Sequence, residues 1–428
     1  MLSGVQSNNG GKPVHEKCRL FFLHDGDRML TVAVIGGGLA GLAAAYSLRG
    51  SARVTLFEKA TRIGGRVLTS TTPRGEHGAE YFLGTETTIN TLLRGLNIKA
   101  QECRWEWPAY AFGGRIAKGD PQDAANRLLG VKTGKHLGKL FVLAKSPGKP
   151  KEARFSAFAW KLLEGDPDSI RFATTLLAGE TCSPPEHLST DYALASLWSA
   201  VEPRERWYRV AEGTQHLVDA LRFHGRPSIN LHTKVTTVRQ DPGGIRVTWT
   251  GNDGPDFQVF DSAIVATPHG ESLVGLVAAH HFHSYISILL SYDHIPCVVG
   301  RSDVSLADGL YVDGFANYVN LVPGDGPPFF LRVLIPCANA MLGWPDSTIL
   351  RRVVQALHPY LLRAGQHMTW SIKKWKYGLP CGGEDRLCRV VASNLVLAGD
   401  RFSKFPSMNG AIESGFQAAS TIRRALTI

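Results

Sequence analysis

The stretch of sequence that decides the fold reads Leu30-Thr31-Val32-Ala33-Val34-Ile35-Gly36-Gly37-Gly38-Leu39-Ala40-Gly41. Its first half is a β-branched, apolar run, which predicts a buried parallel strand. Its second half has the G-x-G-x-x-G spacing, and good helix formers follow as far as Leu48. In such a turn Gly36 permits the sharp bend, Gly38 lets backbone amides approach a pyrophosphate, and Gly41 lets the helix pack on the strand. The stretch therefore predicts a Rossmann-type dinucleotide site at a helix N-terminus.

A second strand and an acidic residue follow at the expected distance. Residues 53–57 are again apolar and β-branched, and Glu58 comes 22 residues after Gly36. A carboxylate about 20 residues after the first glycine accepts hydrogen bonds from ribose hydroxyls, and it repels a 2′-phosphate. An ordinary βαβ turn is the alternative. The order of strand, glycines, helix, strand and acid favours the dinucleotide site.

Later segments favour FAD over NAD. Gly64-Gly65-Arg66 offers a second close approach of the backbone and a cation beside a diphosphate. Residues 76–82, Glu-His-Gly-Ala-Glu-Tyr-Phe, contain small residues against which a flat ring could lie. Near the C-terminus an apolar run predicts a strand that delivers Asp400 to the edge of a sheet, and a helix is expected from about Asn409. The positive end of that helix would stabilise a reduced flavin. A C-terminal helix that only docks on the sheet is the alternative.

These blocks resemble the flavin amine oxidase superfamily, which includes monoamine, polyamine and amino-acid oxidases, protoporphyrinogen oxidase, carotenoid desaturases and renalase. Residues 32–58, 64–82 and 394–419 carry the resemblance and span nearly the whole chain. It implies an α/β fold with a Rossmann-type FAD-binding domain (p-hydroxybenzoate hydroxylase-like) and an interleaved α+β substrate domain. The implied FAD-binding domain is discontinuous and comprises residues 29–95, 203–272 and 388–428. The implied substrate domain comprises residues 96–202 and 273–387.

The resemblance also implies which residues bind the cofactor. Val235 would hold the adenine with its backbone, and Asp400 would bind the ribityl or phosphate region. The implied set is Gly36, Gly38, Leu39, Ala40, Gly41, Glu58, Lys59, Gly64, Gly65, Arg66, Gly78, Ala79, Glu80, Tyr81, Val235, Gly399, Asp400, Met408, Asn409 and Ala411. Cys381 lies in the region of the covalent flavin cysteine of monoamine oxidases, but the Cys-Tyr context is missing. Non-covalent FAD is therefore expected.

Two positions depart from the amine oxidases. Their lysine that holds a water near the flavin N5 aligns with Ser287, and their aromatic residue before the last helix aligns with Ser407. Residues 374–380, Lys-Trp-Lys-Tyr-Gly-Leu-Pro, resemble the renalase-like and desaturase-like members more closely. Trp375 and Tyr377 are the candidates for a wall of the flavin or substrate site. The alternative is that both are aromatic core residues of a strand.

Three functions are consistent with this sequence. The first is an FAD oxidase acting on a small amine or amino acid, with oxygen or another electron acceptor as its partner. The second is an FAD dehydrogenase or desaturase that forms a C=C bond in a larger apolar or cyclic intermediate. The third is a non-catalytic binding protein on the same scaffold, like the Rab GDP-dissociation inhibitors. The intact Gly36, Glu58 and Asp400 argue against the third.

Charge disfavours a nucleic-acid-binding protein. The net charge is +10, and part of the excess lies between Lys132 and Lys161 without any recognition motif. A solvated surface is therefore favoured over a nucleic-acid face. Apolar residues among these lysines leave association with a membrane surface as an alternative.

Cysteine spacing and hydropathy bear on location and metal content. The seven cysteines show no paired framework and no metal-site spacing, so reduced thiols, no metal and a cytoplasmic location are expected. No apolar run reaches the roughly 18 residues that a membrane span needs.

His280, His281 and His283 are interpreted as a surface or packed cluster. Residues 1–28 are polar and aperiodic, and are expected to be a disordered lead.

Overall fold

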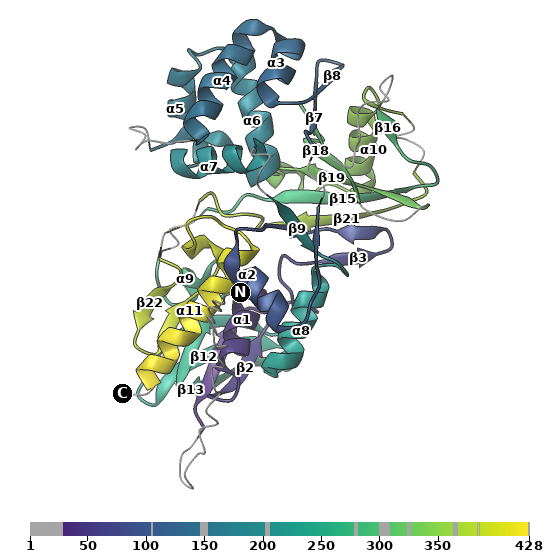
Figure 1. Cartoon of the computed structure of the whole chain (residues 1–428). Helices are drawn as coiled ribbons and strands as arrows, with labels where there is room; N and C mark the ends of the chain where they lie inside the picture. Colours follow the sequence, from purple (N-terminus) through teal and green to yellow (C-terminus); the bar gives the residue numbers. More distant parts are fainter. Residues whose placement is uncertain are drawn as a thin grey trace, which may run out of the picture.

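The computed structural model describes residues 29–103, 106–145, 153–201, 206–277, 281–298, 309–322, 327–362, 367–382, 384 and 386–426. The expected lead at 1–28 and His280 lie outside these residues. Within the described ranges, no helix combines the length and the apolar character needed to cross a lipid bilayer. Figure 1 shows one sheet with its helices in the lower part of the molecule, and a second sheet beside a group of helices in the upper part.

The lower sheet has six strands in the order β10-β2-β1-β14-β23-β22. β1 lies inside this sheet because its apolar run is buried on both faces. The pairs of β1 with β2 and β14, of β2 with β10, and of β14 with β23 are parallel, whereas β22 and β23 are antiparallel. The strands are β1 (Thr31–Ile35), β2 (Arg53–Phe57), β10 (Ser228–Asn230), β14 (Ser262–Val265), β22 (Arg389–Ala392) and β23 (Leu395–Leu397).

Alternate residues of β1 face two different layers. Val32 and Val34 pack with the helices α1 (Leu39–Leu48), α8 (Gln215–Gly225) and α11 (Met408–Leu426). Ala33 and Ile35 pack with a three-stranded antiparallel sheet of β11 (Lys234–Asp241), β12 (Gly244–Gly251) and β13 (Gly254–Phe260). The β1–α1 turn is thus held between two packed layers.

The upper sheet has seven strands in the order β21-β15-β19-β18-β17-β7-β8. Its strands are β7 (Ala109–Phe112), β8 (Arg115–Lys118), β15 (Tyr285–Tyr292), β17 (Leu310–Val312), β18 (Tyr318–Val322), β19 (Phe329–Ile335) and β21 (Thr369–Trp375). Helix α10 (Asp346–Leu357) packs against apolar residues of β15 and β19. A helical group packs against Tyr110, Phe112 and Tyr311 and comprises α3 (Pro121–Leu129), α4 (Val131–Lys145), α5 (Phe155–Leu162), α6 (Pro167–Thr181) and α7 (Thr190–Val201).

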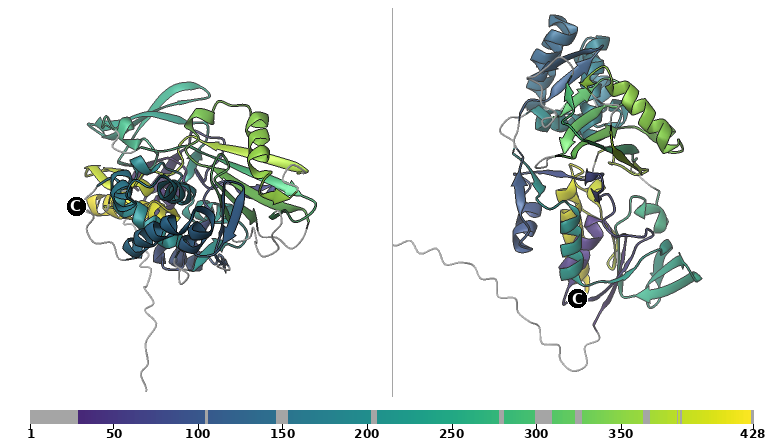
Figure 2. Two further views of the ribbon diagram at one scale, coloured as in Figure 1. Left: turned by 90° about the horizontal axis from the view of Figure 1, so that it is seen from above. Right: turned by 90° about the vertical axis from the view of Figure 1, so that its right-hand side faces the viewer.

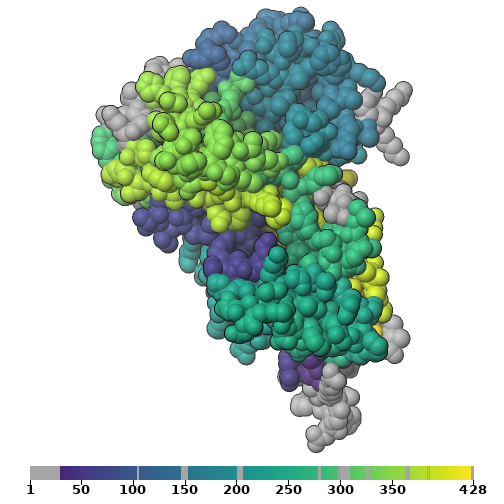
Figure 3. All heavy atoms as spheres, turned by 180° about the vertical axis from the view of Figure 1, so that it is seen from behind, coloured from purple at the N-terminus to yellow at the C-terminus, as the bar shows by residue number. Residues whose placement is uncertain are grey.

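Short elements connect the two sheets (Figure 2). The hairpin of β3 (Thr69–Thr71) and β4 (Arg74–Glu76) reaches the upper sheet, since a Cβ on Gly75 would lie 2.8 Å from Cδ2 of Leu289. From behind, N-terminal residues are visible at the waist between the two parts (Figure 3). The remaining short elements are β5 (Tyr81–Leu83), β6 (Ala100–Glu102), β9 (Trp207–Val210), β16 (Cys297–Val298), β20 (Leu361–Leu362), α2 (Thr87–Gly95), α9 (Gly270–Leu273), η1 (Pro185–His187), η3 (Asn339–Met341) and η4 (Asp400–Phe402).

Candidate functional site

The turn between β1 and α1, residues 36–41, forms a concave surface of backbone atoms, which is called the cradle below. Gly36 has a φ of +106°, a conformation that favours glycine, and its N–H donates to the carbonyl O of Phe57 at 2.8 Å. A Cβ on Gly36 would lie 2.5 Å from the carbonyl O of Ala266, and one on Gly41 would lie 2.0 Å from that of Gly36. Only glycines therefore allow strand, turn and helix to approach this closely.

The N-cap residue of α1 has no side chain that could cap the helix. Gly38 is the N-cap residue, and Leu39 and Ala40 behind it are buried. The first amides of a helix lack partners within the helix and carry the positive end of its dipole. A buried helix start without a side-chain cap fits a diphosphate, so the residues present fit the expected FAD.

The second glycine pair lies directly against this cradle. Gly38 and Gly64 form an isolated parallel bridge, and the N–H of Gly64 donates to the carbonyl O of Gly37 at 2.7 Å. A Cβ on Gly65 would lie 3.0 Å from the Cα of Gly38. The two glycine segments, which are separate in the sequence, thus form one continuous surface of backbone atoms.

Glu58 lies beside the cradle at the end of β2. Its Oε2 accepts from the N–H of Gly37 at 2.8 Å, and its Oε1 accepts from the N–H of Ala60 at 2.9 Å. The N–H of Thr233 donates to the carbonyl O of Glu58 at 2.9 Å, which places the start of β11, with Val235, next to the ribose candidate. Lys59 is exposed, unlike Glu58.

Arg66 and Asp400 join the second glycine pair to the end of β23. Arg66 Nη2 donates to Oδ1 of Asp400 at 2.6 Å, and Nη1 donates to Oδ2 at 2.9 Å. Nη1 also donates to the carbonyl O of Gly378 at 2.7 Å. Asp400 is buried and follows Gly399, whose φ is +140°. This forked pair fixes two of the expected cofactor residues relative to each other.

Residues 78–80 link the cradle to the upper sheet. A Cβ on Gly78 would lie 1.8 Å from the carbonyl O of Arg66, and the N–H of Ala79 donates to that same oxygen at 3.1 Å. Glu80 forms a buried ion pair with Arg332 of β19, with Oε2 2.5 Å from Nη1. Arg332 also donates to the carbonyl O of Gly78 at 2.9 Å. Both charges are thus compensated at the junction of the two sheets.

Burial raises the pKa of two acidic groups near this segment. Oε1 of Glu76 accepts from the hydroxyl of Thr69 and from the N–H of Thr214, both at 2.8 Å, whereas the buried Oε2 has no hydrogen-bond partner among the described residues. Burial raises the pKa of the Glu76 carboxyl. Tyr81 meets the ring of Trp207 edge-on at 6.5 Å, and burial raises the pKa of its hydroxyl.

His77 directly follows β4 and contacts two strands of the upper sheet, β15 and β21. Its Nδ1 lies 3.3 Å from Oγ of Ser287 on β15, and its Nε2 lies 2.8 Å from Oγ of Ser371 on β21. Its carbonyl O accepts from Nε1 of Trp375 at 2.7 Å. Burial, followed by the positive charge of Arg332, lowers the pKa of His77 to about 4. His77 is therefore neutral at neutral pH, and the Ser287 hydroxyl is already engaged.

We expect His77→Asn to remove part of the pH dependence of stability. The pKa of His77 is about 4 in the folded chain against an ordinary value of 6.5, so only the unfolded chain binds the proton between these values. The contribution of His77 is complete above pH 6.5 and falls by about 3 kcal/mol as the pH approaches 4. In denaturant unfolding, the advantage of the wild type over the variant should shrink across this window. An advantage that is the same at both ends would contradict the assignment.

The two aromatic candidates contact different groups. Trp375 is buried and packs with Tyr285, with ring centroids 6.1 Å apart. Tyr377 instead meets His269 edge-on at 4.5 Å, and Nζ of Lys59 lies 5.6 Å from its ring centroid. The structure therefore places Trp375 beside His77 and Tyr377 beside the strand end that carries Glu58.

The start of α11 is tied to α2. Oγ of Ser407 accepts from the N–H of Gly410 at 3.1 Å and donates to Oε1 of Glu86 at 2.8 Å. Oδ1 of Asn409 accepts from the N–H of Ile89 at 2.9 Å. Met408 is buried and Ala411 half-buried. Ser407 thus acts as a helix cap, a role that its alignment with an aromatic residue did not predict.

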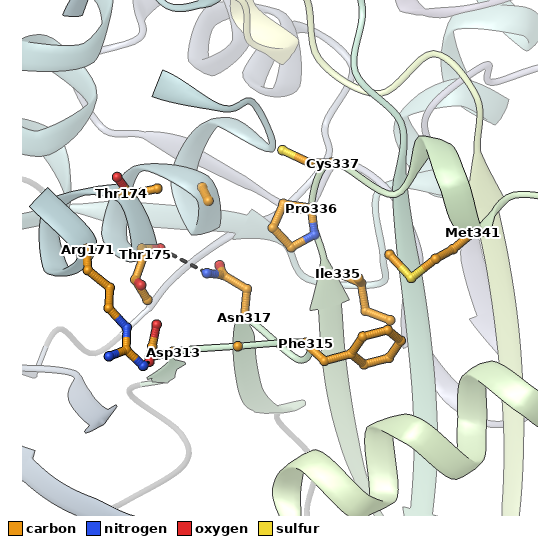
Figure 4. A pocket seen from close by; sticks show the side chains of 12 residues that line it. Arg171, Thr174, Thr175, Asp313, Phe315, Asn317, Ile335, Pro336, Cys337 and Met341 are labelled. Atoms are coloured by element: carbon orange, nitrogen blue, oxygen red, sulfur yellow. Dashed lines mark hydrogen bonds and ion pairs between the residues drawn. The ribbon is translucent and has the colours of Figure 1, made fainter. Parts of the chain in front are cut away.

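A cavity of about 390 Å³ lies between α6 and the upper sheet (Figure 4). At one side Arg171 and Asp313 form an ion pair, and Nδ2 of Asn317 donates to the carbonyl O of Thr175 at 3.0 Å. At the other side Cys337 donates to the carbonyl O of Cys182 at 3.6 Å. Cys182 packs in one cluster with Tyr285 and Trp375, which are not among the residues that line the cavity.

Sequence reasoning missed His77 and Arg332. His77 stands beside the small residues Gly78 and Ala79, and nothing in the pattern of this segment indicates a role for its imidazole. Arg332 interrupts the apolar strand Phe329–Ile335, and a charge within such a strand predicts a buried partner. The sequence contained that signal, but it did not identify Glu80 as the partner.

Comparisons with known proteins agree with this geometry. A family model described as flavin containing amine oxidoreductase matches residues 39–423. Achacin of Lissachatina fulica is 35% identical over 82 residues, which are 18% of this chain and 15% of achacin. The chain therefore matches only a small part of the length of that curated relative.

Solved structures match over almost the whole chain. Putrescine oxidase bound to putrescine has a TM-score of 0.74 and 18% identity, over 93% of this chain and 99% of its own. Cyclohexylamine oxidase from Brevibacterium oxydans IH-35A has a TM-score of 0.71 and 16% identity, over 94% of this chain and 100% of its own. These likenesses confirm the predicted α/β fold class. The family match confirms the predicted superfamily and, with it, FAD as the cofactor.

Proposed function

Because the chain belongs to the flavin-containing amine oxidoreductase family, a family of FAD-dependent oxidoreductases, we propose that it oxidises an amine or amino acid with non-covalently bound FAD. The observation that carries the proposal is the buried start of α1, which has no side-chain cap and faces Gly64 and Gly65. Glu58 lies on one side of this cradle, and the Arg66–Asp400 pair follows the second glycine pair. A dinucleotide offers the matching groups, namely ribose hydroxyls and a diphosphate.

Each of these groups has one task in the proposal. The amides of Leu39 and Ala40 bind the diphosphate, Glu58 accepts from the ribose hydroxyls, and the backbone of Val235 holds the adenine. Residues 78–81 and Trp375 would hold the flavin ring. Bound FAD would supply the acceptor for a hydride from the substrate carbon, with oxygen or another acceptor as the final oxidant.

The protein contributes position and electrostatics rather than proton transfer. His77 remains uncharged at neutral pH because burial lowers its pKa to about 4, so it offers neutral hydrogen bonds to Ser287 and Ser371 of the upper sheet. The Glu80–Arg332 pair holds the backbone of Gly78 through the 2.9 Å hydrogen bond to its carbonyl. Both interactions fix the segment that would carry the ring.

Three further assignments belong to this proposal. The division into FAD-binding and substrate domains is supported by the two sheets, since the six-stranded sheet draws on residues 29–95, 203–272 and 388–428 and the seven-stranded sheet on the rest. Non-covalent binding is supported by Cys381, whose thiol accepts from Ser183 at 3.8 Å. A reducing, cytoplasmic location is supported by the free thiols of Cys103, Cys182, Cys337, Cys381 and Cys388.

Anaerobic mixing of the FAD-loaded protein with a panel of amines and amino acids tests the reaction. The visible flavin absorption should disappear with at least one member of the panel. In air, the same compound should yield hydrogen peroxide in proportion to its consumption. A flavin that no amine or amino acid reduces would contradict the proposed substrate class.

A dehydrogenase or desaturase acting on a larger apolar substrate is the second candidate. It is favoured by Ser287 and Ser407, which stand where amine oxidases have the lysine and an aromatic residue. Ser287 lies 3.3 Å from His77, and Ser407 is bonded to Glu86 and Gly410. Reduction of the flavin by an apolar cyclic compound, with slow reoxidation in air, would favour this candidate.

A further inference from the structure

Three side chains of metal-binding type converge from distant parts of the chain and have no task in the proposed reaction. His187 ends η1, His283 precedes β15, and Cys381 follows β21. Nδ1 of His187 lies 2.6 Å from Nε2 of His283, and the rings are stacked with centroids 4.7 Å apart. All three ligand atoms, including Sγ of Cys381, lie within 4.8 Å of one another. The prediction of no metal rested on spacing along the chain, which cannot reveal such a convergence.

Paired backbone holds two of these residues in place. The N–H of Cys381 donates to the carbonyl O of His281 at 3.0 Å, and the N–H of Gly378 donates to that of His283 at 2.8 Å. Phe282 and Pro380 form an isolated bridge between these bonds. His283 is buried and Cys381 half-buried, whereas His187 is exposed on a single short turn. The site thus has two fixed ligands and one that can adjust.

We propose that His187, His283 and Cys381 bind a divalent metal ion of the zinc type. Imidazole nitrogen and thiolate sulfur are the ligands that Zn²⁺ prefers, and they do not suit Mg²⁺ or Ca²⁺. Nitrogens bound to one tetrahedral Zn²⁺ lie about 3.3 Å apart, so the rings must separate slightly from their present 2.6 Å. The exposed His187 allows this movement. Water, Glu186 or His281 is available for the fourth position, since the ring of His281 lies 6.5 Å from that of His187.

The metal would connect two parts of the molecule that come from distant segments of the chain. His187 lies between α6 and α7 of the helical group, and the other two ligands lie on the segments that flank β15 and β21. Phe282, next to His283, lies 6.0 Å from the guanidinium of Arg66. Metal binding would therefore fasten the helical group to the segment packed against the Arg66–Asp400 pair.

Zinc content of the untagged, FAD-loaded protein tests this inference. The protein is stripped with a chelator, dialysed against Zn²⁺ and then against metal-free buffer, and its bound metal is measured. We expect one equimolar Zn²⁺ in the wild type and its loss in Cys381→Ser and in His187→Ala. Cys103→Ser, which changes a free thiol elsewhere, should keep the metal. Co²⁺ should give red d–d absorption bands, beyond the flavin spectrum, in the wild type and not in Cys381→Ser.

Two outcomes overturn the inference. A wild type that retains no Zn²⁺ would show that the three residues form only a hydrogen-bonded cluster. Equal retention by the wild type, Cys381→Ser and His187→Ala would place the metal elsewhere. Should Cys381→Ser fail to hold FAD, the His187→Ala variant decides, because His187 is exposed on η1 and is not one of the residues assigned to the cofactor.

Discussion

Replacing Arg332 with methionine is expected to lower the free energy of unfolding by about 3–5 kcal/mol. The change removes the partner of Glu80, and both side chains are more than nine-tenths buried at 8% and 4% exposure. A carboxylate left buried without its cation keeps its desolvation cost and loses the compensating charge. Denaturant unfolding at neutral pH, with the same FAD concentration for each protein, measures the effect.

Two variants make this result specific to the buried charge. Adding Glu80→Gln to Arg332→Met removes the unpaired charge, so the double variant should recover part of the loss. Arg206→Met breaks an exposed pair with Glu102, whose side chains are 67% and 48% exposed, and should cost at most about 1 kcal/mol. If Arg332→Met were no more harmful than Arg206→Met, the buried pair would not stabilise the junction of the sheets.

Replacing Gly41 with alanine is expected to weaken FAD binding at least tenfold, or by about 1.4 kcal/mol or more. The new Cβ would lie 2.0 Å from the carbonyl O of Gly36, so α1 must move away from β1. The amides at the start of α1 would then no longer point at the diphosphate. Titration of the stripped protein with FAD, followed by flavin fluorescence, measures the change.

Gly95→Ala is the matched control. It makes the same chemical change at the end of α2, where a Cβ would meet no atom within 4 Å. This variant should bind FAD like the wild type. Unchanged affinity in Gly41→Ala would show that the turn does not form the phosphate cradle.

The part of the site on the six-stranded sheet could be predicted from sequence because its residues lie close together along the chain. Gly36, Gly41 and Glu58 act within one strand–turn–helix–strand unit, so their spacing along the chain already reflects their positions in space. Gly64 and Gly65 could be recognised as a second backbone approach. Their contact with Gly38 follows from tertiary packing and was not predicted.

The part of the site next to the seven-stranded sheet depends on contacts between segments that are distant in the sequence. Glu80 is paired with Arg332 of β19, and His77 contacts Ser287 of β15 and Ser371 of β21, which are far from it in sequence. Residues 96–202 were predicted only as part of a substrate domain, yet they form the helical group and contribute β7 and β8 to the upper sheet. Their periodicity does not specify which strand they pair with.

The visible absorption spectrum of the purified protein, recorded before and after denaturation and filtration, tests the central claim most directly. We predict flavin bands in the native protein and their complete passage into the filtrate after denaturation. A colourless protein that takes up no added FAD would contradict the claim that this chain is an FAD-dependent oxidoreductase.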